Sequence, residues 1–581
     1  MMNDKVNRHQ DSIDLAISHT VDAVISPPLA PRPSLLTPDP WSLAPDPSDK
    51  IHEECGVFGV YAPGEDVARL TYFGLYALQH RGQESAGIAT TSGNDLMIRT
   101  RMGLVSTAFD EESLAGLTGH AAIGHTRYST TGSSKICNAQ PLRLHDPALG
   151  WLALAHNGNV TNVNPLRAEL QGQGVQFETT SDSEVIGKLA IASHGSNWVT
   201  KFRRAMSRLT GAYSLALLTP THLIAVRDPL GIRPLCIGRL PGTAPVGEHS
   251  KHKGEPIAHS PLRNAQSKAG GWVIASESCA LMTIGAEFIR EIEPGEIVTI
   301  GPEGLTSYGD VPSAAQAMCV FEYIYFARPD SVINNVSLYT ARQNMGRELA
   351  REHPADADIV IGVPDSATPA AIGFSLESGI PFTEGLIKNR YIGRTFIQPH
   401  QHLRERGIGL KFNPLPGVLR GKRVVVVDDS IVRGTTTRPI VELLRRAGAT
   451  EVHVRIHSPA MSHPCYLGVD TARREELIAH RMSVPDIARH IGADSLGYLS
   501  LPGLFRAVGL GGERLCSGCF TGDYPVPVQL DFAHADGKMA LEDSGIRDQG
   551  PEANGHIQGG LELELDQVEM DRDRVPVGFD L

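Results

Sequence analysis

The chain has 581 residues, of which 41% are hydrophobic and 20% charged, a composition typical of a soluble protein with two or more domains. Its formal net charge of -12 argues against a non-specific binder of nucleic acid or of an anionic membrane surface. No apolar stretch reaches the length of a membrane helix, and the N-terminus lacks the basic start followed by an apolar run that is typical of a secretion signal. We therefore expect a cytoplasmic protein with no nucleic-acid or membrane partner, in which the eight cysteines are free thiols, nucleophiles or metal ligands and not a disulfide framework.

Residues 1–54 are rich in Pro, Ser and Asp, and this composition predicts a disordered leader. From residue 55 to about 310, short strand-like runs such as 56–61 and 151–155 alternate with Gly-rich turns. This pattern predicts a first domain of stacked sheets with covering helices.

Beyond residue 311 the pattern changes. The run 424–427 consists of four valines, and an amphipathic helical stretch follows it. Continuous β-branched runs that alternate with helices are typical of a parallel sheet covered on both faces, so residues 311–527 are predicted to form an α/β domain. Residues 528–581 are polar and acidic, which predicts a flexible tail.

Four segments of the first domain together supply the groups that amide hydrolysis requires: residues 53–59, 125–130, 156–159 and 180–184. Cys55 is the candidate nucleophile, and the Asn157 side chain with the Gly158 backbone N–H is the candidate oxyanion hole. Arg127 can bind a carboxylate in a bidentate manner and Asp182 can hold an ammonium group, which are the two charged ends of glutamine. Without the other segments, Cys55 would be interpreted as a small hydrophobic residue at the start of the core.

These segments resemble the glutaminase domain of N-terminal-nucleophile amidotransferases. The resemblance implies an αββα fold of stacked antiparallel sheets, and it adds Thr130 to the glutamine-binding residues. It also implies that residues 1–54 are a propeptide, longer than is usual in the family, whose removal frees the α-amino group of Cys55 as general base. Such a group has a pKa of roughly 7.7 to 8 and accepts a proton at cellular pH.

Residues 424–437 place Asp428 and Asp429 and a Gly/Thr loop between a buried strand and the start of a helix. The two acids can accept hydrogen bonds from vicinal ribose hydroxyls, and the loop can bind a phosphate with its amides, its hydroxyls and the helix dipole. The alternative is an acidic turn that caps a helix.

This segment resembles the phosphoribosyl pyrophosphate (PRPP) motif of type I phosphoribosyltransferases, and residues 363–366 and 388–396 match two further family segments. The resemblance implies one Mg²⁺ per subunit at Ser366, Asp428 and Asp429, consistent with the preference of Mg²⁺ for oxygen ligands. One departure is Gly409, where the family often has arginine. The other implied PRPP-binding residues are Lys388, Arg390, Arg394, Lys411, Arg433, Gly434, Thr435 and Thr436.

Cys516 and Cys519 form a C-x-x-C pair, which by itself fits a redox pair or chance. The contexts of this pair, of Cys319 and of Cys465 resemble the branch of amidotransferases that binds a 4Fe–4S cluster with four cysteines. A four-cysteine zinc site is the main alternative. The remaining thiols are predicted to be buried small residues: Cys137, Cys236 and Cys279.

Together the two halves resemble the amidophosphoribosyltransferases over residues 50–527. The resemblance implies a pentosyltransferase that hydrolyses glutamine and transfers the ammonia to PRPP, giving 5-phosphoribosylamine in the first step of purine synthesis. It further implies inhibition by purine nucleotides and a homotetramer. The alternatives are an amidotransferase that makes glucosamine phosphate, a PRPP-sensing regulator without activity, and a redox-sensing iron–sulfur protein.

Overall fold

The computed structural model of the chain describes residues 55–93, 95–128, 135–241, 270–309, 316–389, 411–469, 471 and 473–528. The predicted leader lies outside these residues, as do Thr130, Arg390, Arg394 and the predicted tail from residue 529 onward. No helix within the described ranges combines the length and the apolar character needed to cross a membrane.

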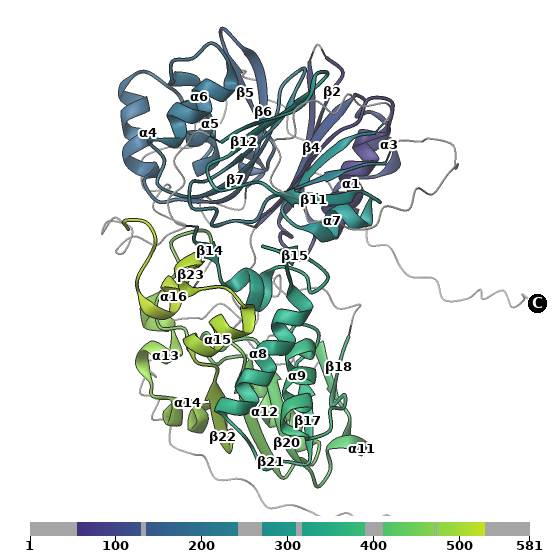
Figure 1. Cartoon of the computed structure of the whole chain (residues 1–581), viewed down its shortest axis with the longest axis vertical. Coiled ribbons are helices and arrows are strands. Elements are labelled where there is room, and N and C mark those ends of the chain that lie inside the picture. The colour runs from purple at the N-terminus through teal and green to yellow at the C-terminus, as the bar shows by residue number, and fades with distance from the viewer. Residues whose placement is uncertain are drawn as a thin grey trace, which may run out of the picture. The chain divides into compact units, whose positions relative to one another are not determined.

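Two antiparallel sheets form the first domain (Figure 1). The seven-stranded sheet has the order β11-β9-β10-β1-β4-β2-β3 and contains β1 (Gly56–Tyr61), β2 (Ser85–Thr91), β3 (Leu96–Met102), β4 (Ala121–Arg127), β9 (Cys236–Arg239), β10 (Trp272–Ala275) and β11 (Glu287–Glu291). The six-stranded sheet has the order β13-β12-β8-β7-β6-β5 and contains β5 (Leu142–Asp146), β6 (Gly150–Val160), β7 (Gly211–Leu218), β8 (Leu223–Arg227), β12 (Ile297–Gly301) and β13 (Gly304–Tyr308).

The alternation of side chains in β1 explains the layers. Val57 and Tyr61 point into the apolar cluster between the sheets, whereas Phe58 and Val60 pack into the cluster on the helical face. That face is covered by α1 (Val67–Ala77), α2 (Val105–Ala108), α3 (Glu111–Ala115) and α7 (Ser278–Thr283). The six-stranded sheet is covered by α4 (Val163–Gly172), α5 (Asp182–Ala192) and α6 (Trp198–Met206). The predicted αββα architecture is confirmed.

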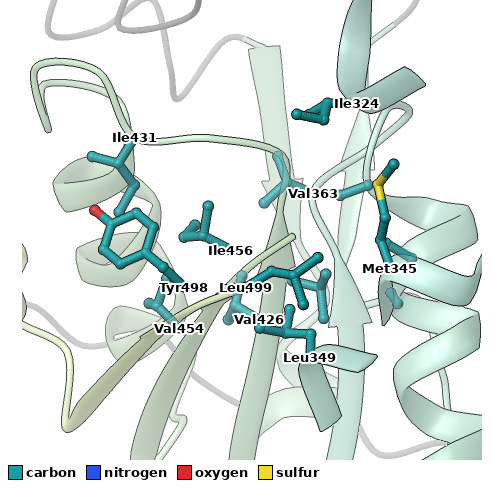
Figure 2. Close-up of a cluster of buried hydrophobic side chains, with 14 of the residues drawn as sticks. Ile324, Met345, Leu349, Val363, Val426, Ile431, Val454, Ile456, Tyr498 and Leu499 are labelled. Atoms are coloured by element: carbon teal, nitrogen blue, oxygen red, sulfur yellow. The ribbon is translucent and has the colours of Figure 1, made fainter. Parts of the chain in front are cut away.

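The second domain contains a four-stranded parallel sheet in the order β17-β20-β21-β22, with β17 (Ile359–Gly362), β20 (Arg423–Asp428), β21 (Glu451–Ile456) and β22 (Ser495–Tyr498). Helices accompany it: α8 (Leu338–Glu352), α9 (Thr368–Ser378), α11 (Pro416–Leu419), α12 (Thr437–Arg446), α13 (Ile478–Arg481), α14 (Val484–Ile491), α15 (Leu501–Val508) and α16 (Gly518–Thr521). Figure 2 shows Val426 and Val454 of the sheet in one apolar cluster with Met345 and Leu349 of α8. The predicted parallel sheet is confirmed.

Short elements complete the description. The two-stranded pairs are β14 (Met318–Cys319) with β23 (Leu515–Cys516), β15 (Val332–Ile333) with β16 (Val336–Ser337), and β18 (Leu386–Lys388) with β19 (Phe412–Pro414). A π-helix, η2 (Glu322–Phe326), follows β14, and the 3₁₀ helices are η1 (Ile136–Asn138), η3 (Arg474–Glu476) and η4 (Gly512–Arg514). The predicted boundary at residues 310–311 falls between β13 and β14, outside the described residues.

Candidate functional site

Cys55 lies immediately before β1, with 7% of its surface exposed. Its thiol donates to the Tyr128 carbonyl at 3.2 Å, and the Tyr128 N–H points back at the sulfur at 3.5 Å. Burial raises the pKa of the Cys55 thiol to about 12, although the Tyr128 hydrogen bond and Arg127 act in the opposite direction. The thiol is therefore neutral at pH 7 and must lose its proton as it attacks.

Both predicted groups for the ends of glutamine lie where their charges influence this thiol. Arg127 ends β4, which pairs with β1, and its positive charge lowers the pKa of Cys55, while Asp182 raises it. Asp182 begins α5 and accepts a hydrogen bond from the Val160 N–H at 3.2 Å, so it lies against the end of β6. The charges of Arg127 and Asp182 thus both act on Cys55.

The predicted oxyanion groups lie on β6 of the other sheet. His125 of β4 donates from Nε2 to the His156 carbonyl at 3.0 Å and thereby joins the two sheets next to Asn157. The Asn157 side chain is fully buried, and neither its amide nitrogen nor its oxygen has a hydrogen-bond partner among the described residues. Unpaired buried amides are costly and rare, so this one is available for a ligand.

Gly158 has a φ of 145°, and a Cβ at this position would lie 2.1 Å from the Ala212 carbonyl oxygen. Only glycine fits both the backbone angle and the close approach of β7. The backbone at Asn157 and Gly158 is thereby held in a shape that suits an oxyanion hole.

The second predicted site lies at the carboxyl ends of neighbouring parallel strands. Asp428 ends β20, and Ser366 follows β17 and donates to the Asp429 carboxylate at 2.6 Å. The Asp429 N–H donates to Asp428 at 2.9 Å, and Ser430 donates to Asp429 at the same distance. This edge of an α/β sheet is where ligands commonly bind, and its three oxygen-bearing side chains suit Mg²⁺.

The loop that follows leads from Arg433 to the start of α12 at Thr437, and its Gly434 has a φ of 82°. Arg433 forms an ion pair with Glu476 at 2.9 Å, and Lys388 forms one with Asp365 at 2.8 Å. Lys411 lies over the Phe412 ring at 5.4 Å. The loop residues Thr435 and Thr436 stand at the helix start, where backbone amides suit a phosphate.

Sequence reasoning missed Arg342, which is 1% exposed on α8. Its guanidinium donates to the Tyr323 carbonyl at 2.9 Å and to the Ala327 carbonyl at 2.6 Å. Burial lowers the pKa of Arg342 to about 10, and the nearby Asp429 carboxylate acts against this shift. Arg342 is thus a buried positive charge near the acidic pair, and nothing in a lone arginine on an amphipathic helix signals that position.

The four cysteines of the predicted cluster line one pocket, together with side chains such as Phe321 and Tyr524. Cys319 of β14 is in register with Cys516 of β23, and the Leu467 N–H donates to the Cys465 sulfur at 3.3 Å. Burial, and then the nearness of the other three sulfurs, raises the pKa of Cys519. The described residues contain no group of three or more His, Cys, Asp or Glu arranged around a single metal ion.

The remaining cysteines lie elsewhere. Cys236 and Cys279 are buried, as predicted, but Cys137 is exposed and the prediction for it was wrong. It lies in the short helix η1, where Asn138 points into the protein instead.

Comparisons with known proteins match both halves of the chain. A model of the glutamine amidotransferase domain matches residues 125–248, and a model of the phosphoribosyl transferase domain matches residues 339–462. The amidophosphoribosyltransferase of Synechocystis sp. is 54% identical over 83% of this chain and 92% of its own length, and that of Mycobacterium tuberculosis is 48% identical over 84% and 89%. The chain belongs to the amidophosphoribosyltransferase family.

Solved structures of the family agree. A glutamine PRPP amidotransferase from Bacillus subtilis, complexed with ADP and GMP, is 44% identical with a TM-score of 0.73 over 82% of this chain and 98% of its own. A structure described as the allosteric regulatory enzyme of purine biosynthesis is 45% identical with a TM-score of 0.74 over 82% and 97%. The fold of this chain is thus that of the amidophosphoribosyltransferases.

Proposed function

We propose that this amidophosphoribosyltransferase hydrolyses glutamine at Cys55 and transfers the ammonia to C1 of PRPP, giving 5-phosphoribosylamine, glutamate and diphosphate. The observation that supports the proposal is that, in a chain of this family, the charges of Arg127 and Asp182 both act on the Cys55 thiol and Ser366 donates to Asp429. The product serves as the first intermediate of purine synthesis, and we place the reaction in the cytoplasm.

In the first half-reaction, the Cys55 sulfur attacks the carboxamide carbon of glutamine, and Asn157 and the Gly158 N–H stabilise the oxyanion that forms. The C–N bond then breaks, ammonia leaves, and water hydrolyses the remaining thioester to glutamate. Because the thiol pKa of about 12 keeps it protonated at pH 7, attack requires a base. We assign this role to the α-amino group that removal of residues 1–54 would create on Cys55 itself.

In the second half-reaction, the nitrogen of ammonia bonds to C1 of PRPP as the C1–O bond to diphosphate breaks. We assign the ribose hydroxyls to Asp428 and Asp429, and the 5-phosphate to residues 433–436. We assign the diphosphate to Lys388, Arg390, Arg394 and Lys411. Ser366, Asp428 and Asp429 would hold one Mg²⁺ per subunit, which neutralises charge on the leaving diphosphate when bound.

The deciding experiment compares glutamine-dependent and ammonia-dependent synthesis of phosphoribosylamine from PRPP and Mg²⁺. Wild-type protein should use both nitrogen donors, and Cys55→Ala should use only ammonia, because ammonia bypasses the glutaminase site. Failure of the wild-type protein to consume PRPP with either donor would refute the function. N-terminal sequencing of active protein should begin at Cys55, and an intact leader on active protein would refute the proposed base.

We further propose that Cys319, Cys465, Cys516 and Cys519 bind a 4Fe–4S cluster. The support is that these four side chains, separated by up to 200 positions in the sequence, line one pocket with a backbone N–H directed at one sulfur. A cluster there would join β14 to the end of the second domain and would be structural.

The cluster is tested by iron and sulfide analysis of Cys465→Ser beside Cys137→Ser, a control in an exposed thiol away from the pocket. Wild-type and Cys137→Ser protein should be brown, with about four iron atoms per chain, whereas Cys465→Ser should lose most of its iron. Colourless protein with one zinc ion per chain would instead support the zinc alternative.

We also propose how the enzyme is inhibited and how its subunits assemble. The Bacillus subtilis relative was solved in complex with ADP and GMP, and we propose that purine nucleotides bind and inhibit this chain. We expect purine nucleoside monophosphates and diphosphates to inhibit the enzyme in the synthesis assay. We also expect a homotetramer, which sedimentation analysis would detect.

A further inference from the structure

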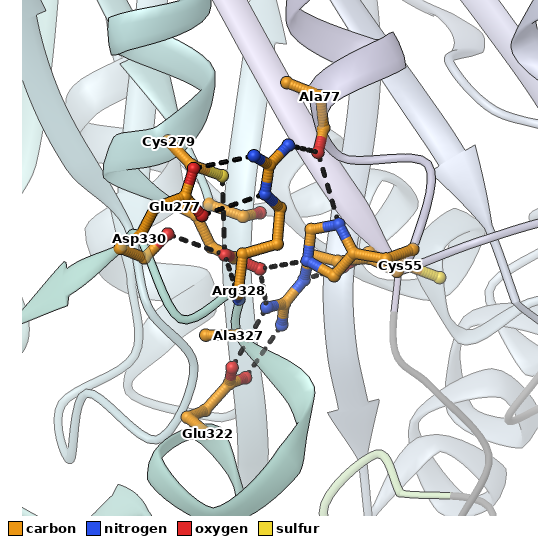
Figure 3. A network of polar contacts seen from close by, with 12 residues as sticks. Cys55, Ala77, Glu277, Cys279, Glu322, Ala327, Arg328 and Asp330 are labelled. Atoms are coloured by element: carbon orange, nitrogen blue, oxygen red, sulfur yellow. Dashed lines mark hydrogen bonds and ion pairs between the residues drawn. The ribbon is translucent and has the colours of Figure 1, made fainter. Parts of the chain in front are cut away.

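A buried arginine holds the backbone of the nucleophile. Arg81 lies in the turn after α1, is 1% exposed, and donates from Nε to the Cys55 carbonyl at 3.1 Å. Its other nitrogens donate to Glu277 at 2.7 Å and to both oxygens of Glu322 at 2.9 and 2.7 Å. Figure 3 shows Glu277, Glu322 and Cys55 in one network of polar contacts.

Glu322 pairs with a second buried arginine. Arg233 is fully buried in the first domain, and its Nη1 lies 3.6 Å from Glu322. The same guanidinium donates to the Leu467 carbonyl from Nε at 3.2 Å and from Nη2 at 2.7 Å. Glu322 therefore bridges an arginine that holds Cys55 and an arginine that holds the segment around Leu467.

That segment contacts the candidate oxyanion groups. The Tyr466 carbonyl accepts a hydrogen bond from the Asn159 side chain at 2.9 Å. Gly468 packs so closely that a Cβ there would lie 3.1 Å from the Gly158 carbonyl carbon. Leu467, the residue that Arg233 holds, stands between these two contacts.

The two glutamates differ in what else they bind. Glu277 also accepts hydrogen bonds from the Arg328 N–H at 2.9 Å and from the Ser331 hydroxyl at 2.8 Å, so it binds residues of the second domain. Glu322 begins the π-helix η2, and its carboxylate faces the two arginines. Without the Glu322 carboxylate, the two buried guanidinium groups would lose a negative charge that balances their positive charges.

We infer that Glu322, which belongs to the phosphoribosyltransferase half, is a positioning residue of the glutaminase reaction. Through Arg81 it fixes the Cys55 backbone, and through Arg233 it fixes the 466–468 segment against the oxyanion turn. The inference rests on the proposed glutaminase activity, and it makes the geometry of one active site depend on a residue of the other domain.

The test uses Glu322→Gln in the protein processed to begin at Cys55, with Asp146→Asn as matched control. Asp146 is also a buried carboxylate, and it pairs with Lys201 at 2.8 Å where β5 meets α6 in the first domain. We expect kcat for glutamine-dependent synthesis to fall roughly 10- to 100-fold in Glu322→Gln, because misplacing reacting groups by about 1 Å has effects of this size. The KM for glutamine should change less than threefold, because Arg127 and Asp182 still bind the substrate.

Ammonia-dependent synthesis distinguishes a positioning role from a purely structural one. If Glu322 positions the glutaminase site, ammonia-dependent synthesis should stay within about twofold of wild type in Glu322→Gln, and Asp146→Asn should retain both activities. Equal loss of the two activities, or an unchanged glutamine-dependent kcat, would overturn the inference. Wild-type protein without any glutamine-dependent activity would instead refute the proposed function.

Arg81→Lys provides a second, independent variant. Lysine keeps the positive charge, but its single nitrogen cannot reproduce the four hydrogen bonds that Arg81 donates to Cys55, Glu277 and Glu322. We expect the same selective loss of glutamine-dependent kcat and slower alkylation of Cys55 by an electrophilic glutamine analogue. In the double variant with Glu322→Gln, glutamine-dependent kcat should be no more than about threefold lower than in either single variant. If Glu322→Gln is insoluble, Arg81→Lys decides: normal alkylation and normal kcat would refute the inference.

Discussion

The Ser366 hydroxyl donates to the Asp429 carboxylate at 2.6 Å and thereby joins the carboxyl ends of β17 and β20. The two residues are 63 positions apart, and the parallel pairing of their strands brings them together. A hydrogen bond to an ionised carboxylate contributes about 1.5 to 3 kcal/mol, so this contact orients a candidate Mg²⁺ and ribose ligand.

Ser366→Ala should therefore lower kcat/KM for PRPP by roughly 10- to 100-fold with either nitrogen donor. The matched control is Ser375→Ala, which removes a 2.6 Å hydrogen bond to the Ile380 carbonyl in the same domain. Steady-state kinetics at several Mg²⁺ concentrations provide the measurement. A loss restricted to glutamine-dependent synthesis would contradict the assignment of Ser366 to the PRPP site.

Asn157→Ala should separate activity from stability. The Asn157 amide has no hydrogen-bond partner among the described residues, so its removal leaves no protein group newly unpaired. We expect glutamine-dependent kcat to fall about 10²- to 10³-fold, as for other oxyanion-hole donors, with a melting temperature at or above that of wild type. A lower melting temperature with normal kcat would show that the amide serves the fold.

Asn138→Ala is the control for this change. Asn138 is equally buried, but it donates to the Thr180 hydroxyl at 2.9 Å and accepts from the Thr180 N–H at 3.0 Å. Its replacement should lower the free energy of unfolding by about 1 to 3 kcal/mol, because the Thr180 groups lose their partners.

Much of the fold and of both sites was predictable because the signals are local. The four valines before Asp428 predict a buried parallel strand, and the residues that follow them predict a phosphate loop within one short segment. Cys55, Arg127 and Asp182 are scattered, yet each lies in a short segment with a recognisable composition.

The ion network around Glu322 could not be predicted. Arg81 and Glu322 are 241 positions apart, and each is a single charged residue that sequence reasoning assigns to solvent by default. Their pairing depends on long-range packing. Cys137 fails for the opposite reason, since a cysteine is expected to be buried but a one-turn helix turns it outward.

His125 should make the protein less stable in mild acid. Burial lowers the pKa of His125 from 6.5 to about 3, and its Nε2–H already donates to the His156 carbonyl, so the buried Nδ1 would need a new partner if protonated. Between pH 6.5 and 3 the unfolded state binds a proton that the folded state does not, so stability falls as the pH falls, by about 1.4 kcal/mol per pH unit.

His125→Gln tests this prediction, because glutamine can keep the donor to His156 but does not titrate. Denaturant midpoints of the first domain between pH 7 and 5 should decline less steeply in the variant than in wild type. Parallel declines would show that other groups cause the acid sensitivity.

Gly468→Ala should impair the glutaminase site from the other domain. Gly468 has a φ of 111°, and an added Cβ would lie 3.3 Å from the Gly158 Cα and 3.2 Å from the Arg233 guanidinium. The methyl group must therefore displace either the oxyanion turn or the arginine that holds Leu467. We expect glutamine-dependent kcat to fall roughly 10-fold or more while ammonia-dependent synthesis is retained.

Gly64→Ala separates this steric effect from backbone strain. Gly64 has a φ of 93°, and a Cβ there would have no atom within 4 Å. Both variants bear the conformational cost of a positive φ, about 1 to 2 kcal/mol, but only Gly468→Ala pushes on Gly158. The contact between the 466–468 segment and the oxyanion turn would have no role in catalysis in either of two cases. In the first, both alanine variants lose glutamine-dependent activity equally; in the second, Gly468→Ala keeps its glutamine-dependent kcat. A selective loss in Gly468→Ala would show that the second domain sets the geometry in which Asn157 and Gly158 meet the substrate.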